Sequence, residues 1–584
     1  MKTRRSHALL IGLGASIVAA VSVAATPIWA AEPPAPPWFT WTTVVNNGDQ
    51  MPDAPAGRTF NSYNQPSVNV NGLVVIRARS RGGPPFGPPT HGIYTRDMVG
   101  PDSPIVRILD RKALVPQPNN LETMFVETPS FPRIDMLSNT IATRGNHQPV
   151  WEYTVDEGHT RAGTTGIYTN PFGPLITGAS KLGAVSDFGF FAVPGLDPPT
   201  MFDVFPGAPA VTDADTIVFK GNYTVGGAGK TGVFYRELVN EAILSDGNSL
   251  APAGGSSPMV LIANNTDTVI PGTVPPVIFG STSPPSAANA HVVFAGFDNE
   301  ESPTLGGIYL APLTPYPSGG QPDLTTLVSI GSRVPGEGVN STFNGLGEGG
   351  AFDGRYVGFW GAWGSETRTV RLYCPTEGNK DRIAYCNRNL ICEDGTTTEE
   401  DKNSICDDES DPNFGIRCYQ EKQLPVNQGI FVHDTVGGGT RTVAKTGARF
   451  DEFTFWNYSG KTPCVGSGGH GQEGAEEDGE PARWRSSAFV AVSGLRTAFK
   501  AVTGGAVGIY LSRQPGQDVL TVLDTRTDGP AVDPEAPAGS KLTELGLERE
   551  GLRGDWLVVN AKMGIEGGTE EDGMAGIYLT QVPK

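Results

Sequence analysis

Short apolar runs alternate with turn residues along most of the chain. Seven of these runs consist of a glycine, an aliphatic residue and an aromatic residue, and they begin at Gly92, Gly166, Gly232, Gly307, Gly429, Gly508 and Gly576. The intervals between them are 74, 66, 75, 122, 79 and 68 residues. A supersecondary unit of roughly 70 residues therefore recurs through the chain.

Each unit predicts several strands. An apolar run that opens at Gly, Asn or Asp precedes the glycine run, as in 73–76, and β-branched and aromatic residues bounded by turn residues are typical of buried strands. Two such runs joined by a short polar loop predict an antiparallel hairpin. A third run follows, as in 105–109, and Phe-rich segments such as 128–131 and 450–453 are expected to supply a fourth strand.

Seven four-stranded antiparallel sheets predict an all-β fold, a seven-bladed β-propeller. The chain ends on a glycine run with no third run after it, whereas residues 42–45 resemble a third run. We expect this N-terminal strand to pair with the C-terminal strand and close the ring, which removes two exposed sheet edges. Eight blades, with 371–373 as a degenerate copy, and an open β-solenoid are the alternatives.

The paired runs, the first ending in Phe or Ala and the second reading Gly-Ile-Tyr, resemble the blades of secreted bacterial β-propeller repeat proteins of uncharacterised function. The resemblance covers nearly the whole chain after the first 30 residues and implies the propeller fold. Because the motif is one of packing, the resemblance brings no catalytic residues. It implies core or inter-blade positions for Tyr94, Tyr168, Tyr309, Tyr510 and Tyr578.

Residues 1–30 are typical of a signal peptide. Three basic residues precede an apolar stretch over 8–25, and Ala30 is a small residue at a plausible cleavage point. We expect residues 31–584 to form one propeller domain that is secreted, either to the periplasm or outside the cell. An uncleaved anchor helix is the alternative, because a stretch of about 18 apolar residues can span a bilayer.

The charge of the chain narrows the choice of partners. Its 43 basic and 62 acidic residues give a formal net charge of −19, and removing the three cations of the signal leaves −22. So acidic a surface repels phosphate backbones, and we expect no nucleic-acid partner. The 76 glycines and 49 prolines, set among recurring apolar runs, indicate short strands joined by tight turns rather than disorder.

The 122-residue interval contains a cysteine-rich, acidic insertion at 374–418. Five of the six cysteines lie in it, and the sixth is Cys464. An even number of cysteines in an exported chain predicts disulfides, and six allow 15 pairings. A bridge between Cys374 and Cys418 would pin the base of an extended hairpin, but the spacing does not select it over the other pairings.

Part of the insertion resembles the calcium loop of low-density-lipoprotein-receptor class A modules. The shared pattern is Cys-x-Asp-x-Ser-Asp at 406–411, with a departure at Pro412, where the module has Glu. Calcium takes six to eight oxygen ligands, which clustered carboxylates can supply. The resemblance implies calcium as a possible cofactor, with Asp394, Asp408 and Asp411 as candidate ligands; a solvated acidic loop is the alternative.

Catalytic motifs do not emerge from the sequence, which has no His-Glu-x-x-His zinc motif and no serine elbow. We therefore expect a monomeric, non-enzymatic propeller that binds a protein or a glycan through its loop faces. Aromatic contact residues could be Trp360, Trp363, Trp456 and Trp484. The alternatives are an extracellular hydrolase of polysaccharides or phosphoesters, with carboxylates at the channel mouth, and a structural surface or matrix component.

Overall fold

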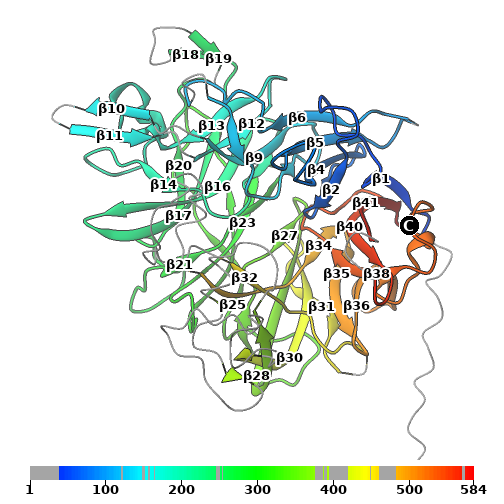
Figure 1. The fold of residues 1–584 in the computed structure, drawn as a ribbon. Coiled ribbons are helices and arrows are strands. Elements are labelled where there is room, and N and C mark those ends of the chain that lie inside the picture. The colour runs from blue at the N-terminus through cyan, green and yellow to red at the C-terminus, as the bar shows by residue number, and fades with distance from the viewer. Residues whose placement is uncertain are drawn as a thin grey trace, which may run out of the picture.

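Seven small antiparallel sheets form a ring in the computed structural model (Figure 1). The structure describes residues 39–583 except 101, 120–122, 148–150, 156–157, 163–164, 245–249, 253, 375–385, 387–390, 393–417, 448, 460–481 and 569–572. The protein is a seven-bladed β-propeller, as the repeat predicts. Residues 371–373 belong to a long strand of the fifth blade and not to an eighth blade.

The blades are numbered in chain order, and each has an innermost strand in two parts followed by three further strands. Blade 1 contains β2 (Phe60–Tyr63), β3 (Ser67–Val68), β4 (Leu73–Ser80), β5 (His91–Asp97) and β6 (Val106–Asp110). Blade 2 contains β7 (Phe125–Glu127), β8 (Arg133–Ile134), β9 (Ile141–His147), β12 (Thr165–Thr169) and β13 (Ile176–Ser180). Blade 3 contains β14 (Phe202–Val204), β15 (Ala210–Thr212), β16 (Thr216–Val225), β17 (Ala228–Glu237) and β20 (Val260–Asn264). Blade 4 contains β21 (Ser281–Thr282), β22 (Ser286–Ala288), β23 (His291–Phe297), β24 (Gly306–Pro312) and β25 (Thr325–Ser329).

The last three blades depart from this plan. Blade 5 contains β26 (Phe343–Leu346), β27 (Ala351–Phe352), β28 (Tyr356–Tyr373), β30 (Cys418–Asp434) and β31 (Thr440–Lys445), with β29 (Ile391–Cys392) added to β30. Blade 6 contains β34 (Val490–Ser493), β35 (Arg496–Thr503), β36 (Ala506–Ser512) and β37 (Val519–Asp524). Blade 7 contains β38 (Lys541–Gly546), β39 (Leu552–Arg553), β40 (Trp556–Gly564), β41 (Met574–Gln581) and, from the other end of the chain, β1 (Thr42–Asn46).

Small elements lie outside the seven sheets. The two-stranded hairpins are β10 (Trp151–Val155) with β11 (Gly158–Ala162), β18 (Ala242–Leu244) with β19 (Leu250–Pro252), and β32 (Phe455–Ser459) with β33 (Arg483–Ser487). The short 3-10 helices are η1 (Lys181–Ala184), η2 (Ser186–Phe191) and η3 (Gly529–Ala531). Within the described residues no helix is both long and apolar enough to cross a bilayer.

The ring closes as the sequence predicts. Strand β1 pairs antiparallel with β41, from Thr42 opposite Leu579 to Asn46 opposite Gly576. Figure 1 shows the first strand, in blue, beside the last, in red. The N-terminal strand thus becomes the outermost strand of blade 7, and both would-be sheet edges are paired.

The innermost strands differ from expectation. The second halves of these strands, β3, β8, β15, β22, β27, β34 and β39, each contact the next in a closed cycle and therefore surround the central axis. The segment 128–131, expected as a strand, forms the break between β7 and β8. In blade 6 the first half is reduced to a bridge between Glu452 and Val502, and the β32–β33 hairpin occupies the break.

The Gly-aliphatic-aromatic run is explained by close packing on the third strand. Residues two apart on a strand share a face, and the aromatic ring leans back over the glycine. A methyl group at Gly576 would lie 2.6 Å from the Tyr578 hydroxyl, and one at Gly508 would lie 2.8 Å from the Tyr510 hydroxyl. The glycines therefore provide the space that the rings fill.

The aromatic ring of each run lies in the core. All five motif tyrosines are at most 1% exposed, as the resemblance implies. In six blades a phenylalanine at the start of the innermost strand meets that ring edge-on, with centroids 4.8–5.2 Å apart. The pairs are Phe60–Tyr94, Phe125–Tyr168, Phe202–Phe234, Phe279–Tyr309, Phe343–Phe431 and Phe450–Tyr510. Edge-to-face pairs at this distance contribute beyond their buried area.

The cysteine-rich insertion connects the two strands of an extended hairpin, as predicted. Strands β28 and β30 pair from Tyr356 opposite Asp434 out to Tyr373 opposite Tyr419, with one irregularity between Trp363 and Thr367. Cys374 is bonded to Cys386 rather than to Cys418. The β32–β33 hairpin packs Tyr458 and Trp484 against this disulfide, so insertions from blades 5 and 6 share a small core.

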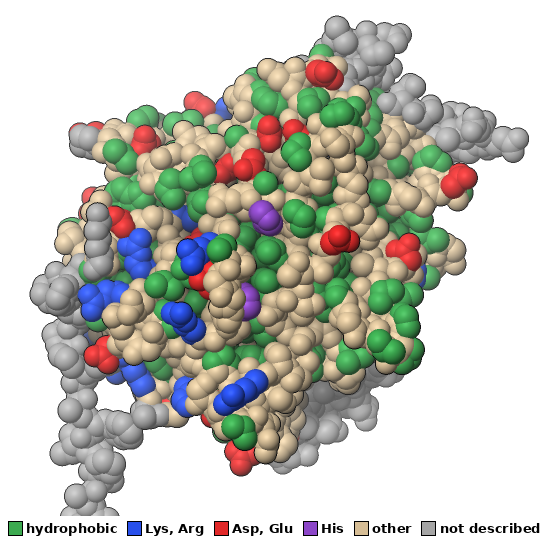
Figure 2. Space-filling view, turned by 180° about the vertical axis from the view of Figure 1, so that it is seen from behind, with side chains coloured by type: hydrophobic (Ala, Val, Ile, Leu, Met, Phe, Trp, Pro, Cys, Tyr) green, Lys and Arg blue, Asp and Glu red, His purple; other side chains and the backbone are tan. Residues whose placement is uncertain are grey.

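Surface charge is mixed on the face opposite to that in Figure 1. Figure 2 shows basic side chains grouped toward its left edge, whereas acidic side chains are scattered over the face. Hydrophobic side chains are dispersed among them. Local charge therefore departs from the acidic average of the chain.

Candidate functional site

The central axis is filled by charged side chains from blade 7. The break between β38 and β39 carries Glu548 and Glu550, which reach Arg133 of blade 2. Nη2 of Arg133 lies 3.1 Å from Oε1 of Glu548, and its Nη1 donates to Oε2 of Glu550. The Ser286 hydroxyl of blade 4 donates to Oε1 of Glu550 at 3.4 Å, and the amide of Val68 in blade 1 donates to its carbonyl at 3.0 Å.

Ion pairs and hydrogen bonds occupy the carboxylates of this network. Arg133, Glu548 and Glu550 are 3%, 8% and 4% exposed. Burial alone would raise the pKa of Glu548, but the charges of Arg133 and Arg549 outweigh it and hold that pKa below its usual value. Neither glutamate lines the groove of about 730 Å³ between blades 7 and 1 or the cavity of about 130 Å³ over blades 2 to 4. Glu548 and Glu550 thus have a structural role at the central axis.

One end of the axis is ringed by the turns that follow the innermost strands. A cavity of about 130 Å³ lies there, over blades 2 to 4, lined by residues that include Asp135, Asp213 and Asn289. The carboxylates bind the neighbouring turns, because the amide of Ala214 donates to Asp135 at 2.6 Å and that of Ala290 to Asp213 at 2.7 Å. Asp135 therefore links blade 2 to blade 3, and Asp213 links blade 3 to blade 4.

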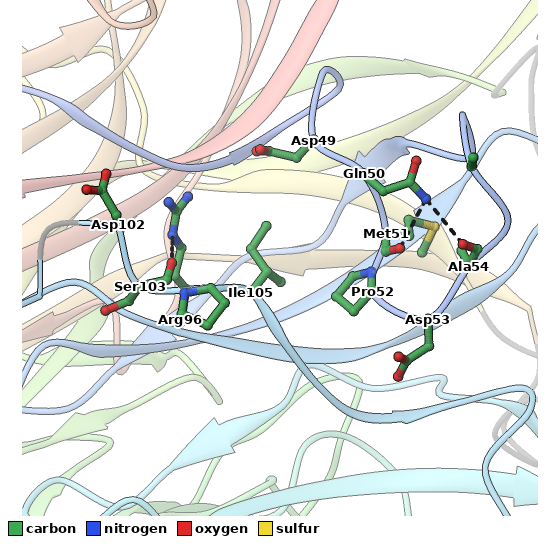
Figure 3. A pocket seen from close by; sticks show the side chains of 12 residues that line it. Asp49, Gln50, Met51, Pro52, Asp53, Ala54, Arg96, Asp102, Ser103 and Ile105 are labelled. Atoms are coloured by element: carbon green, nitrogen blue, oxygen red, sulfur yellow. Dashed lines mark hydrogen bonds between the residues drawn. The ribbon is translucent and has the colours of Figure 1, made fainter.

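The larger cavity is a groove between blades 7 and 1 (Figure 3). Its volume is about 730 Å³, and it is formed by the connection between β1 and β2, by Arg96 of β5 and by the connection between β5 and β6. The lining residues are Asp49, Gln50, Met51, Pro52, Asp53, Ala54, Ala56, Arg96, Asp102, Ser103, Pro104 and Ile105. A concave surface with apolar walls and a few polar groups is typical of a binding site.

Local hydrogen bonds fix the wall contributed by residues 49–57. The side-chain amide of Gln50 donates to the carbonyl of Pro55 at 3.0 Å and accepts from the amide of Gly57 at 2.8 Å. Met51 is 1% exposed and anchors the loop in the core. Asp53, with a φ of 56°, turns the chain between these contacts. The loop is held before any ligand binds, which lowers the entropic cost of binding.

Arg96 joins the two blades across the groove. Its Nε donates to the carbonyl of Ser103 at 2.9 Å, and its Nη1 donates to the carbonyl of Val44 in β1 at 2.7 Å. Carbonyl oxygens occupy these donors, so Arg96 braces the groove (Figure 3).

The carboxylates give the groove a negative charge. Asp53 and Asp102 are exposed, and Asp49 is half-buried. Asp53 lies 3.2 Å from Nη2 of Arg107, which also contacts Asp110. Asp53 is thus partly neutralised by Arg107, but Asp49, Asp53 and Asp102 together still outnumber the guanidiniums of Arg96 and Arg107. This excess of negative charge favours a cationic ligand.

The predicted calcium ligands Asp394, Asp408 and Asp411 lie outside the described residues. In the part of the chain that the structure describes, no group of three or more His, Cys, Asp or Glu side chains could hold a metal. The calcium site remains a prediction from the resemblance.

The four candidate tryptophans pack against other side chains and do not project into solvent. Trp363 is 6% exposed and meets Phe431 edge-on, and Nε1 of half-buried Trp360 donates to Gln428 at 3.0 Å. Trp456 and Trp484 are half-buried in β32 and β33. None of the four lines the groove. The residues that line the groove match no recognised sequence motif. The one sequence feature that points to them is the polar connection after residues 42–45.

No protein-family profile and no curated protein sequence matches the chain. Among solved structures it is similar to the β-propeller domain of the trilobed protease from Pyrococcus furiosus, described as having an open velcro topology, with 8% identity and a TM-score of 0.35 over 90% of this chain and 99% of that one. The periplasmic gluconolactonase PpgL of Pseudomonas aeruginosa is 10% identical, with a TM-score of 0.24 over 79% and 95%. The tricorn protease is 10% identical, with a TM-score of 0.15 over 86% and 43%. These likenesses concern the fold alone.

Proposed function

We propose that this protein is an exported, non-enzymatic propeller that binds a basic segment of a partner protein in the groove between blades 7 and 1. The observation that carries the proposal is the groove itself, about 730 Å³ in volume, with Asp49, Asp53 and Asp102 on its walls. A lysine or arginine side chain offers the complementary charge, and its aliphatic stem suits the apolar surface of Pro52 and Ile105.

Export is part of the proposal. The disulfide between Cys374 and Cys386 supports it, because disulfides persist in oxidising compartments. The basic and then apolar N-terminal sequence supports it as well.

Binding is favoured over hydrolysis by the state of the axial carboxylates. A glycoside hydrolase with carboxylates at the channel mouth needs a carboxylate pair that can exchange protons beside a substrate cavity. Glu548 and Glu550 are instead paired with Arg133, and Asp135 and Asp213 bind turn amides. In the groove, by contrast, Asp53 and Asp102 are exposed to solvent and within reach of a partner.

The test uses a fluorescein-labelled six-residue peptide with three lysines and the same peptide with three glutamates. Fluorescence anisotropy should show that the lysine peptide binds more tightly at 20 mM than at 300 mM NaCl, because salt screens exposed charges. The double variant Asp53→Asn/Asp102→Asn should bind it about 2 to 30 times more weakly, since each exposed ion pair contributes about 0.2–1 kcal/mol.

Asp97→Asn is the matched control. Asp97 is an exposed carboxylate at the end of β5 that does not line the groove, so Asp97→Asn removes one negative charge nearby, as each of Asp53→Asn and Asp102→Asn does alone. Equal binding of both peptides, or equal loss in the control and in either single groove variant, would overturn the proposal.

A further inference from the structure

Blade 1 reverses the charge of the rest of the chain. Between residues 58 and 112 there are eight basic and three acidic side chains, a local net charge of +5, whereas the whole chain carries −19. Blade 1 is therefore a positively charged region of an otherwise acidic protein. Such a region attracts anionic groups.

Three arginines and a histidine come together at one end of this blade. Arg77 and Arg79 lie two residues apart on β4 and so share a face, and Arg79 lies opposite His91 of β5. Arg111 follows β6, and its amide donates to the carbonyl of His91 at 3.3 Å. We call Arg77, Arg79, His91 and Arg111 the arginine cluster.

Two of these guanidiniums have neutral partners. Nε of Arg79 donates to the Ser62 hydroxyl at 2.8 Å, and Nη1 of Arg111 donates to the carbonyl of Pro89 at 3.1 Å. Neither forms an ion pair with a carboxylate of the described residues. Their charge is therefore available to a ligand.

Blade 2 adds one negative and one positive group. Nη2 of Arg77 lies 3.7 Å from Oε1 of Glu127, and its other donors bind the carbonyl of Thr128 and the side-chain oxygen of Asn64. Arg144 of β9 also lies near enough to act on Arg77. The cluster and its neighbours thus hold an excess of positive charge.

His91 reports the resulting potential. Its Nδ1 is buried without a hydrogen-bond partner in the structure. Burial, together with the charges of Arg77, Arg111 and Arg79, lowers the pKa of His91 to about 4. The imidazole is neutral at pH 7 because burial first, and the neighbouring guanidiniums second, disfavour a positive charge there. A bound anion would offset the contribution of the guanidiniums and raise this pKa.

We propose that the arginine cluster binds an oxyanion group, such as a phosphate, sulfate or carboxylate carried by an acidic small molecule. Guanidinium groups pair with such groups through parallel, charge-assisted hydrogen bonds. This site is separate from the proposed groove, because it faces blade 2 and takes a ligand of opposite charge.

The test follows the imidazole of His91 by NMR in protein labelled with 13C-histidine. Sodium phosphate, sodium sulfate and sodium acetate are titrated separately at constant ionic strength, so that screening does not change. The His91 signal should shift saturably with at least one anion, and its pKa should rise from about 4. The anion that acts identifies the group, and His433, buried in blade 5, should not respond.

Paired variants locate the site. Arg79→Gln and Arg111→Gln should each weaken binding about tenfold, because a charge-assisted hydrogen bond is lost. Lys112→Gln is the control, since Lys112 is exposed beside Arg111 and carries the same charge. No saturable shift in the wild-type protein with any of the three anions would overturn the proposal, as would equal weakening in the control.

Discussion

Replacing Arg133 with methionine should destabilise the propeller and change how its stability depends on pH. The substitution keeps a long side chain at the axis but removes the guanidinium that contacts Glu548 and Glu550. Both carboxylates are less than a tenth exposed, so water cannot replace the lost partner. Breaking a buried ion pair from one side costs about 3–5 kcal/mol.

The expected loss lies near the lower end of that range, at about 3 kcal/mol. Arg549 remains 3.7 Å from Glu548, and Arg553 remains 3.9 Å from Glu550, so the carboxylates keep part of their compensation. These contacts are longer than the 3.1 Å between Arg133 and Glu548. They reduce the penalty without removing it.

The pH dependence separates this mechanism from a simple packing defect. In the wild type the pKa of Glu548 is lowered below 4.5, so its contribution to stability is present above that pH and is lost as the pH falls. In the variant, burial should raise this pKa above 4.5. The folded state then gains from protonation, and stability is lost as the pH rises through the folded pKa.

The assay is urea unfolding at pH 7.5 and pH 4.5, followed by tryptophan fluorescence. The variant should lose about 3 kcal/mol at pH 7.5 and clearly less at pH 4.5. Arg236→Met is the control, because Arg236 is fully buried but donates to the carbonyls of Gly178, Gly255 and Ser257. Its loss should be similar at both pH values. An Arg133→Met deficit that does not change with pH would refute the reasoning.

Two further predictions concern the blade packing. Gly429→Ala should cost about 1–3 kcal/mol, because the new methyl group would lie 2.6 Å from the carbonyl oxygen of Ala444 in the neighbouring strand; Gly320→Ala, in open space, should be nearly neutral in the same urea assay. Burial lowers the pKa of Lys500 from 10.5 to about 8, so Lys500 should titrate near pH 8 by 13C-lysine NMR. The free energy of unfolding should rise between pH 8 and 10.5, because the folded state then no longer has to bury a charged ammonium group. A normal lysine titration would contradict the enclosure of its ammonium by the rings of Phe455 and Phe489.

The blades could be predicted because their signal is local. The glycine of each run makes space for the ring two residues later, so both partners of the contact lie within three residues. Ring closure was equally accessible, since residues 42–45 and 327–330 share the pattern of an outermost strand. Both predictions depend on a short-range pattern that recurs about every 70 residues, apart from the interval that contains the insertion.

The axis and the groove could not be predicted because their contacts are distant in sequence. Arg133 and Glu550 are 417 residues apart, and nothing in either local sequence specifies the other. The sequence did not predict the break in each innermost strand. Both halves of that strand pair with the same second strand, and no local sequence pattern indicates where the first half ends. The disulfide between Cys374 and Cys386 was one of many pairings that the spacing permits.

The closure of blade 7 by the N-terminal strand has a consequence for the order of folding. Among the strands of the ring, β1 is synthesised before all the others and its partner β41 after all the others. Contacts so far apart in sequence form slowly, because a long loop must close before they contribute any stability. Until then blade 7 lacks its outermost strand, and the exposed edge of β41 is open to pairing with other chains. We therefore expect the pairing of β1 with β41 to form late in folding and to protect this edge from aggregation.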